Sequence, residues 1–187
     1  MLYLISGASR SGKSLLAKRL LSEKNIPYLS LDWLMMGFNH GIPEYGIHHL
    51  LWPHEIAERM EPFLRGAIDS MMADDTDHVI EGEAMLPAFA AELAEKYPGE
   101  VRSVFLGFGE IAADDKVTIV KKHSYGESDW LANKSDDYII DHIQNMIAYS
   151  KTIREGCEEC GVPYVETSGD FLEALEEAMG VLVGGVR

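Results

Sequence analysis

The chain has 187 residues, of which 47% are hydrophobic, and this fits one globular domain with a buried core. Its 31 acidic and 16 basic residues give a formal charge of −15, which repels phosphate backbones and anionic lipids, so neither nucleic acid nor a membrane is expected as a partner. No apolar run approaches the roughly 18 residues of a membrane span, and the first residues lack the basic start and long apolar stretch of a secretory signal, so a cytoplasmic protein is expected.

Short apolar segments alternate with longer amphipathic segments along the chain. The expected strands cover residues 2–6, 26–32, 78–82, 101–107 and 162–167. The expected helices cover residues 14–24, 54–73, 87–97, 110–121, 136–160 and 170–182, while 33–53 lacks a clear period and is predicted to be an irregular insertion. Because helices of ten or more residues separate the strands, the pattern predicts a three-layer α/β fold with a parallel sheet.

The stretch GASRSGKS, residues 7–14, lies between the first strand and the first helix and fits the pattern G-x-x-x-x-G-K-[ST]. Such a loop wraps a triphosphate with its backbone N–H groups; Lys13 would reach the β and γ phosphates, and the Ser14 hydroxyl would bind Mg²⁺. A glycine turn that only caps a helix would leave this lysine and serine unexplained. The residues expected to contact the nucleotide are Gly7, Ala8, Ser9, Arg10, Ser11, Gly12, Lys13, Ser14 and Leu15.

Carboxylates follow the second and third predicted strands, at the sheet edge where parallel α/β folds bind ligands. Asp32 is predicted to orient or deprotonate an acceptor hydroxyl, with a helix or turn cap as the alternative. Glu81 is predicted to lie on the Mg²⁺ side or to order water. Glu83 is predicted to contact the substrate or to be a solvated cap, and the sequence leaves the choice between the two glutamates open.

Taken in order, these motifs resemble small P-loop kinases of the nucleoside-monophosphate-kinase and shikimate-kinase-like group. The resemblance rests on GASRSGKS, SLD after strand two, EG after strand three, a polar segment before a long helix, and PYVETSGD. It implies one domain over residues 1–187, a five-stranded sheet in the order 2-3-1-4-5, an acceptor-binding flap at 33–75 and a lid at 122–135. It also implies ATP and Mg²⁺ as cofactors and Asp32 as the base or the acceptor-positioning residue. Two departures are Ser30, where the group often has another aspartate, and a lid segment without arginine.

Three arginines are candidates for binding anionic groups. The resemblance implies a phosphate-clamping role for Arg154, on the helix after the lid, and the alternative is an exposed helix charge. Arg59 and Arg65, on the helix at 54–73, could grip an anionic acceptor through their bidentate guanidinium groups. They are six residues apart, so at most one of them is expected to point inward.

Residues 33–54 are rich in histidine and aromatic residues, and an aromatic-walled acceptor pocket, a histidine metal site and plain packing remain open for them. The TSGDF segment, 167–171, is predicted to cap a helix and to contact the nucleobase through its backbone. NKSD at 133–136 matches the NKxD motif that recognises guanine, but it follows no buried strand. The match is therefore interpreted as a coincidence. CEEC at 157–160 closes a helix and has no second cysteine pair, so reduced, incidental cysteines are expected.

The predicted function is a Mg²⁺-dependent P-loop kinase that transfers the γ-phosphoryl group of ATP to a small hydroxyl- or phosphate-bearing metabolite. A nucleoside triphosphate and a small acceptor are the expected partners, and no protein partner is inferred. One alternative is a regulatory NTPase or switch, against which the lack of a D-x-x-G γ-phosphate sensor counts. A second alternative is a toxin-type nucleotide-sugar kinase.

Overall fold

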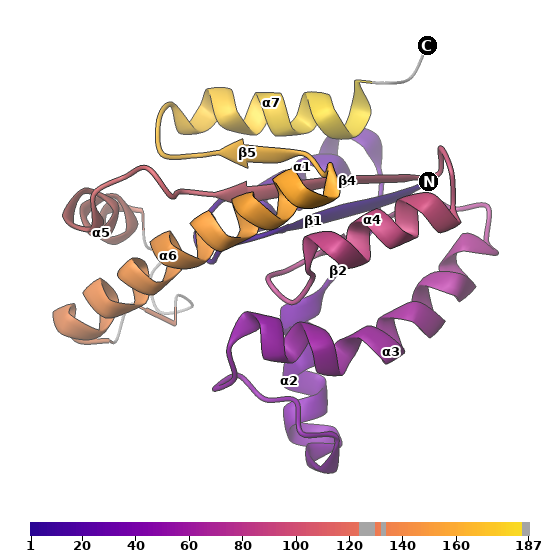
Figure 1. The fold of residues 1–187 in the computed structure, drawn as a ribbon, viewed down its shortest axis with the longest axis horizontal. Helices are drawn as coiled ribbons and strands as arrows, with labels where there is room; N and C mark the ends of the chain where they lie inside the picture. Colours follow the sequence, from indigo (N-terminus) through magenta and orange to yellow (C-terminus); the bar gives the residue numbers. More distant parts are fainter. Residues whose placement is uncertain (124–129, 132–133, 185–187) are drawn as a thin grey trace.

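A computed structural model describes residues 1–123, 130–131 and 134–184 of the chain. Five parallel strands form one sheet in the order β2-β3-β1-β4-β5, which confirms the predicted fold class and strand order (Figure 1). The strands are β1 (Leu2–Gly7), β2 (Tyr28–Ser30), β3 (His78–Glu81), β4 (Val101–Gly107) and β5 (Tyr164–Glu166).

Helices cover both faces of the sheet (Figure 1). They are α1 (Lys13–Lys24), α2 (Leu31–Gly41), α3 (Pro53–Met72), α4 (Pro87–Lys96), α5 (Ala113–Lys122), α6 (Asp136–Cys160) and α7 (Phe171–Val183), with a short 3-10 helix, η1 (Pro43–Tyr45). Among the described residues, no helix combines the length and the apolar character that crossing a membrane requires.

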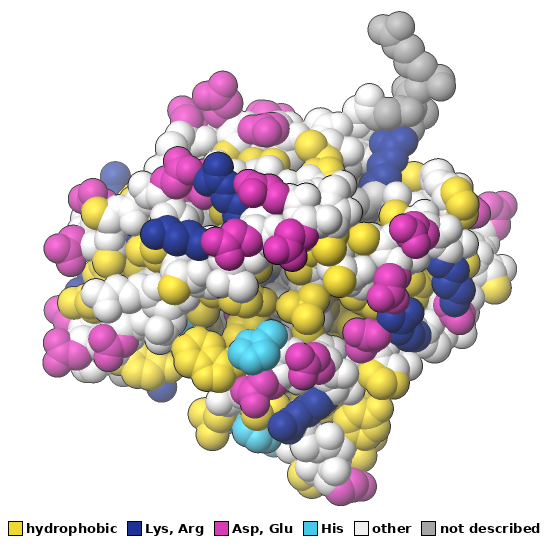
Figure 2. All heavy atoms as spheres, viewed as in Figure 1, with side chains coloured by type: hydrophobic (Ala, Val, Ile, Leu, Met, Phe, Trp, Pro, Cys, Tyr) yellow, Lys and Arg dark blue, Asp and Glu magenta, His cyan; other side chains and the backbone are white. Residues whose placement is uncertain are grey.

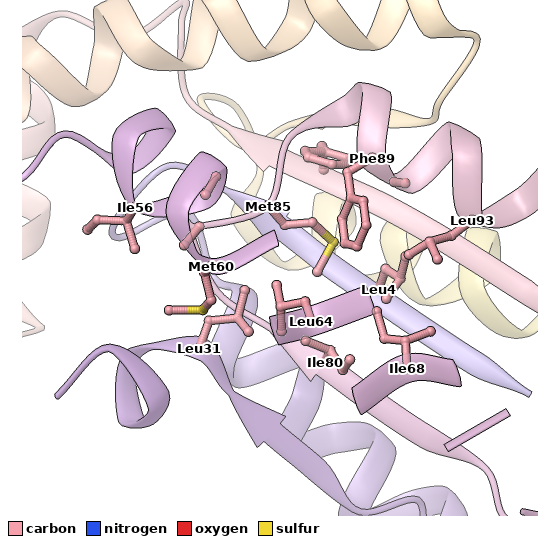
Figure 3. Packing of buried hydrophobic residues seen from close by; sticks show 14 of the residues in the cluster. Leu4, Leu31, Ile56, Met60, Leu64, Ile68, Ile80, Met85, Phe89 and Leu93 are labelled. Atoms are coloured by element: carbon pink, nitrogen blue, oxygen red, sulfur yellow. The ribbon is translucent and has the colours of Figure 1, made fainter. Parts of the chain in front are cut away.

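The side chains of β1 alternate between two cores, as expected for a strand buried on both faces. Leu4 points into a core shared with α2, α3, α4 and α6, which also contains Ile80, Met60 and Phe89 (Figure 3). Ile5 points to the other face, where α1 and α7 cover the sheet. The sheet is therefore the middle of three layers.

A third apolar cluster lies beyond the carboxyl ends of β1 and β4. It joins Ala8 and Phe108 to α5 and to the amino-terminal half of α6. Leu131, from the predicted lid segment, is also buried in it. The loop at residues 7–14, α5 and α6 thus share one packing unit at the carboxyl edge of the sheet.

The predicted irregular insertion at 33–53 is wrong in its first part, because α2 begins at Leu31, directly after β2. The predicted second strand at 26–32 is accordingly too long at both ends. Leu31, Leu34 and Phe38 have the i, i+3, i+7 spacing of a helix face and pack into the core on the α3 side. Glycines at 37 and 41 obscure this period in the sequence.

Two motif interpretations can be compared with the structure. Cys157 and Cys160 are free cysteines in the last turn of α6, and burial raises the pKa of the Cys157 thiol to about 12, which makes it unreactive. Ser135 of the NKSD stretch caps α6 by accepting a hydrogen bond from the Tyr138 N–H. Its Asn133 lies outside the described residues, as do 124–129 and 132 of the predicted lid.

Candidate active site

The phosphate loop joins β1 to α1 at the carboxyl edge of the sheet. Gly7 has φ 129°, and a Cβ there would overlap the Leu106 carbonyl and lie 2.6 Å from the Leu106 nitrogen. The Ala8 N–H donates to the Leu106 carbonyl at 3.0 Å and fixes the start of the loop against β4. Gly12, at φ 106°, ends the loop directly before α1. Glycine is therefore required where the chain leaves β1 and strongly favoured where it enters α1.

The loop presents the amino end of α1 to the space beyond the sheet. The N–H groups of a first helical turn have no intrahelical acceptor and carry the positive end of the helix dipole, so they bind anions well. Ser11, also in the loop, is fully buried, and its hydroxyl has no hydrogen-bond partner among the described residues. Backbone and side-chain donors at this turn therefore suit a phosphate.

Lys13 is the buried cation of this loop, at 7% exposure. Its Nζ donates a 2.6 Å hydrogen bond to the Ala8 carbonyl of the same loop and lies 3.9 Å from Glu83 Oε1. The ammonium group is thus folded over the loop and faces the end of β3. A polyphosphate in the loop would offer this ammonium a stronger, charged partner than a carbonyl.

Ser14 and Glu81 form an oxygen pair at the start of α1. The Ser14 hydroxyl donates to Glu81 Oε2 at 3.1 Å, and Glu81 is 3% exposed at the end of β3. Oxygen ligands suit Mg²⁺, which commonly keeps several waters and takes further ligands from substrate phosphates. No group of three or more potential metal-ligating side chains occurs in the described part of the chain. A cation held by this pair would therefore depend on phosphate and water oxygens, which fits the Mg²⁺ of a bound nucleotide.

Glu83 lies between the loop and the acceptor side of the site. Its carboxylate is close to Lys13 and accepts a hydrogen bond from the Ser9 side chain. Burial is the largest cause that raises the pKa of Glu83; Lys13 opposes it, and the negative charges of Asp32 and Glu81 raise the pKa further. Two neighbouring carboxylates and one ammonium group thus act on Glu83.

Asp32 is not at the end of a strand, as the sequence predicted, but in the first turn of α2. The position of Asp32 differs from the prediction because β2 ends at Ser30 and α2 begins at the next residue, Leu31. The carboxylate is exposed, and it is near enough to Glu83 to raise the pKa of that residue. Ser30, the residue before the helix, makes no side-chain capping bond. Asp32 therefore lies beside the loop while open to solvent.

The candidate arginines have other partners in this structure. Arg59 donates to the Gly46 carbonyl, and Arg65 pairs with Glu61 at 2.7 Å and with Glu92. Arg154, 44% exposed, pairs with Glu110 at 2.6 Å and with Glu158 at 3.4 Å. The structure brings Lys13, Ser14, Glu81, Glu83 and Asp32 together, whereas these arginines point to partners outside that group.

Sequence reasoning missed Lys116, which is 4% exposed in the first half of α5. Its Nζ donates to the Arg10 carbonyl of the phosphate loop at 3.1 Å and lies 3.9 Å from the centre of the Phe108 ring. A lysine four residues before Val120, on the buried face of a short helix, was the signal that could have revealed it.

Two other residues near the loop were not anticipated. Tyr149 of α6 donates to the Glu83 backbone carbonyl at 3.4 Å, and burial followed by the Glu83 charge raises its pKa. Trp130, in the predicted lid, lies under the Arg10 guanidinium at 5.8 Å and against the His142 ring at 5.0 Å. Lid and loop residues are therefore in contact. For TSGDF, the predicted helix cap is confirmed, since Asp170 accepts from the N–H groups at 172 and 173.

The sheet order and the glycine-bounded loop at the amino end of α1 define a P-loop α/β fold. Gluconokinase from Sinorhizobium meliloti 1021 has a similar fold, with a TM-score of 0.61 and 19% identity over 97% of this chain and 91% of that one. Shikimate kinase from Bacteroides thetaiotaomicron is similar at a TM-score of 0.57 and 16% identity, over 97% of this chain and 98% of that one.

An uncharacterized protein from Eubacterium ventriosum ATCC 27560 also shares the fold, with a TM-score of 0.53 and 16% identity over 98% of each chain. No protein-family model matches the sequence, and no curated protein matches it either. The likeness thus covers the whole fold at low sequence identity.

Proposed function

We propose that this protein is a Mg²⁺-dependent, ATP-using P-loop kinase that phosphorylates a hydroxyl group of a small molecule. The observation that carries the proposal is the convergence of Lys13, the Ser14–Glu81 pair and the carboxylates of Glu83 and Asp32 at the mouth of one phosphate loop. Its fold neighbours, a gluconokinase and a shikimate kinase, support the same reaction class. A cytoplasmic location is part of the proposal.

On the nucleotide side, the loop amides bind the phosphates, and Lys13 exchanges the Ala8 carbonyl for a phosphate oxygen. Ser14 and Glu81 hold Mg²⁺, which, when bound, would offset negative charge on the phosphates. Because phosphoryl transfer has a loose transition state, these groups contribute mainly position and charge.

On the acceptor side, Asp32 accepts the proton of the attacking hydroxyl or orients that hydroxyl. Glu83 supports it by binding a second acceptor group, and its burial next to two other carboxylates gives it a raised pKa. The proposed flap at 33–75, formed by α2, η1 and α3, surrounds this side, and the proposed lid at 122–135 closes the site. Arg154 can join the transferring phosphoryl group only if it leaves Glu110, so its role stays a prediction.

The proposal is tested by ADP release from MgATP in the presence of pooled small metabolites. We expect one small hydroxyl compound to accelerate release, and Lys13→Ala to abolish both the acceleration and saturable MgATP binding. Lys18→Ala, an exposed change on α1, is the matched control and should behave like the parent. Acceleration by a protein alone would favour the regulatory switch, and no saturable binding of any nucleoside triphosphate would refute both readings.

A further inference from the structure

We infer that the acceptor of this kinase carries no anionic group and is an uncharged or amine-bearing hydroxyl compound. The inference rests on the proposed function and adds the charge class of the substrate. Its basis is an imbalance between carboxylates and available cations on the acceptor side of the site.

Glu83 lies among other carboxylates at the end of β3. Glu83 lies 3.9 Å from Lys13, and the negative charges of Asp32 and Glu81 both reach it. Among the groups that shift Glu83 most, Lys13 is the cation and the other charged groups are acids. Once a nucleotide binds, Lys13 turns to the phosphates, and a magnesium-bound triphosphate still brings net negative charge. Asp32 and Glu83 are then left facing the acceptor without a matching cation.

The proposed flap at 33–75 does not supply a matching cation. Residues 33–75 contain only two basic residues besides histidine, Arg59 and Arg65, and no lysine. Arg59 is bound to the Gly46 carbonyl, where it ties the η1 loop to α3. Arg65 is held by Glu61 and Glu92 and lies over the Phe89 ring at 4.9 Å. Over α2 and α3, Figure 2 shows histidine and acidic side chains beside a basic one.

On the lid side, Lys122 is exposed at the end of α5, and the other basic side chains described there have partners. Lys121 pairs with Asp136 at 2.6 Å, and Lys134 lies over the Tyr138 ring at 5.0 Å. Lys116 is turned toward the backbone of the phosphate loop. In the sequence, 124–129 adds Glu127 and Asp129 but no lysine or arginine.

An anionic acceptor would therefore meet two carboxylates, while both arginines of the flap are bound to other groups in the described structure. A hydroxyl, in contrast, donates a hydrogen bond to a carboxylate, and an ammonium group adds charge to such a bond. The expected order of preference is amine-bearing or uncharged acceptors first and carboxylates last.

The test uses acceptor sets matched in skeleton and differing in charge. One set is glucosamine, glucose and gluconate; a second is serinol, glycerol and glycerate; a third is shikimate methyl ester and shikimate. ADP release is followed at saturating MgATP. We expect kcat/KM in at least one set to be tenfold or more higher for the amine or uncharged member than for the carboxylate. A carboxylate that equals or exceeds its partners, or no acceleration by any compound, overturns the inference.

Two variants identify the groups responsible. Glu83→Gln removes one carboxylate, and Trp33→Lys adds an ammonium group on an exposed residue next to Asp32. Each should lower the ratio of amine to carboxylate kcat/KM by threefold or more, whereas Glu95→Gln, an exposed change on α4 outside the flap and the lid, should leave it unchanged. If Trp33→Lys has the same ratio as the exposed control, the assignment is overturned, even if Glu83→Gln is inactive and yields no ratio. Saturable, Lys13-dependent MgATP binding separates this failure from failure of the kinase proposal.

Discussion

At the scale of single residues, two buried lysines donate hydrogen bonds to carbonyl groups of the phosphate loop. Lys13 folds over the Ala8 carbonyl, and Lys116 reaches the Arg10 carbonyl from α5. Arg10 has φ 64°, an uncommon conformation for a residue with a side chain. The Lys116 hydrogen bond at that residue stabilises the conformation. Loop geometry therefore depends on one residue within the motif and on another about a hundred residues later.

The buried ammonium group of Lys116 predicts a specific pH dependence of stability. Burial, opposed by Glu166 and assisted by Arg10, lowers the pKa of Lys116 from 10.5 to about 8. Between these values the unfolded chain holds a proton that the folded chain has released, so the free energy of unfolding rises with pH. Relative to Lys116→Met, the parent should gain up to about 3 kcal/mol between pH 8 and 10.5.

Urea unfolding at several pH values measures this difference. Lys18→Met, on the exposed side of α1, is the control and should run parallel to the parent. Parallel curves for Lys116→Met and the parent would show that Lys116 is not desolvated.

Asp32 carries the residue-scale prediction for catalysis. Asp32 lies beside the loop in which Lys13 and Ser14 are proposed to hold the nucleotide, so Asp32→Ala should lower acceptor phosphorylation by about 10² and leave MgATP affinity nearly unchanged. Turnover and nucleotide binding are measured separately on the same preparation. Asp75→Ala, in the exposed turn before β3, is the control, and unchanged turnover would remove Asp32 from the mechanism.

At the scale of elements, the turn from β1 to α1 depends on the register between β1 and β4. Gly7 pairs with Leu106, and the Ala8 N–H donates to the same residue's carbonyl. The two strands approach so closely here that a side chain at 7 has no room. The sheet itself thereby fixes where the phosphate loop starts.

Gly7→Ala should destabilise the fold by clearly more than about 1 kcal/mol, because it adds a backbone clash to an unfavourable φ. Thermal unfolding measures the loss. Gly99→Ala is a matched control, since Gly99 has φ 78° but open space around its Cβ position, and its cost should come from φ alone. An equal loss of stability at the two positions would mean that β4 moves to make room for the added methyl group.

At the scale of the whole molecule, the ligand-binding edge gathers the phosphate loop, α2, the end of β3 and the start of α5. These segments lie far apart in the sequence and meet because all five strands are parallel. A ligand that bridges them should stabilise the fold as one unit.

MgATP at about 100 times its dissociation constant should add about 2.7 kcal/mol of stability, which corresponds to a rise of about 5–10 °C in the unfolding temperature. Differential scanning fluorimetry checks this. Lys13→Ala should lose most of the shift while Lys18→Ala keeps it. The same shift in both variants would place nucleotide binding away from the phosphate loop.

The sequence by itself determined the fold class, the phosphate loop and most helices, since these follow from local periodicity and from a motif of eight consecutive residues. It failed at α2, because two glycines and a mixed composition hid a helical face that only packing against α3 makes stable. Tertiary structure alone decided the partners of the charged side chains. Arg59 and Arg154 were candidates for binding anionic groups, and in the structure they pair with a carbonyl and a carboxylate. Lys116, which the sequence did not single out, contacts the phosphate loop. A long side chain takes the partner that the fold brings within reach, and the spacing of residues in a chain carries no such information.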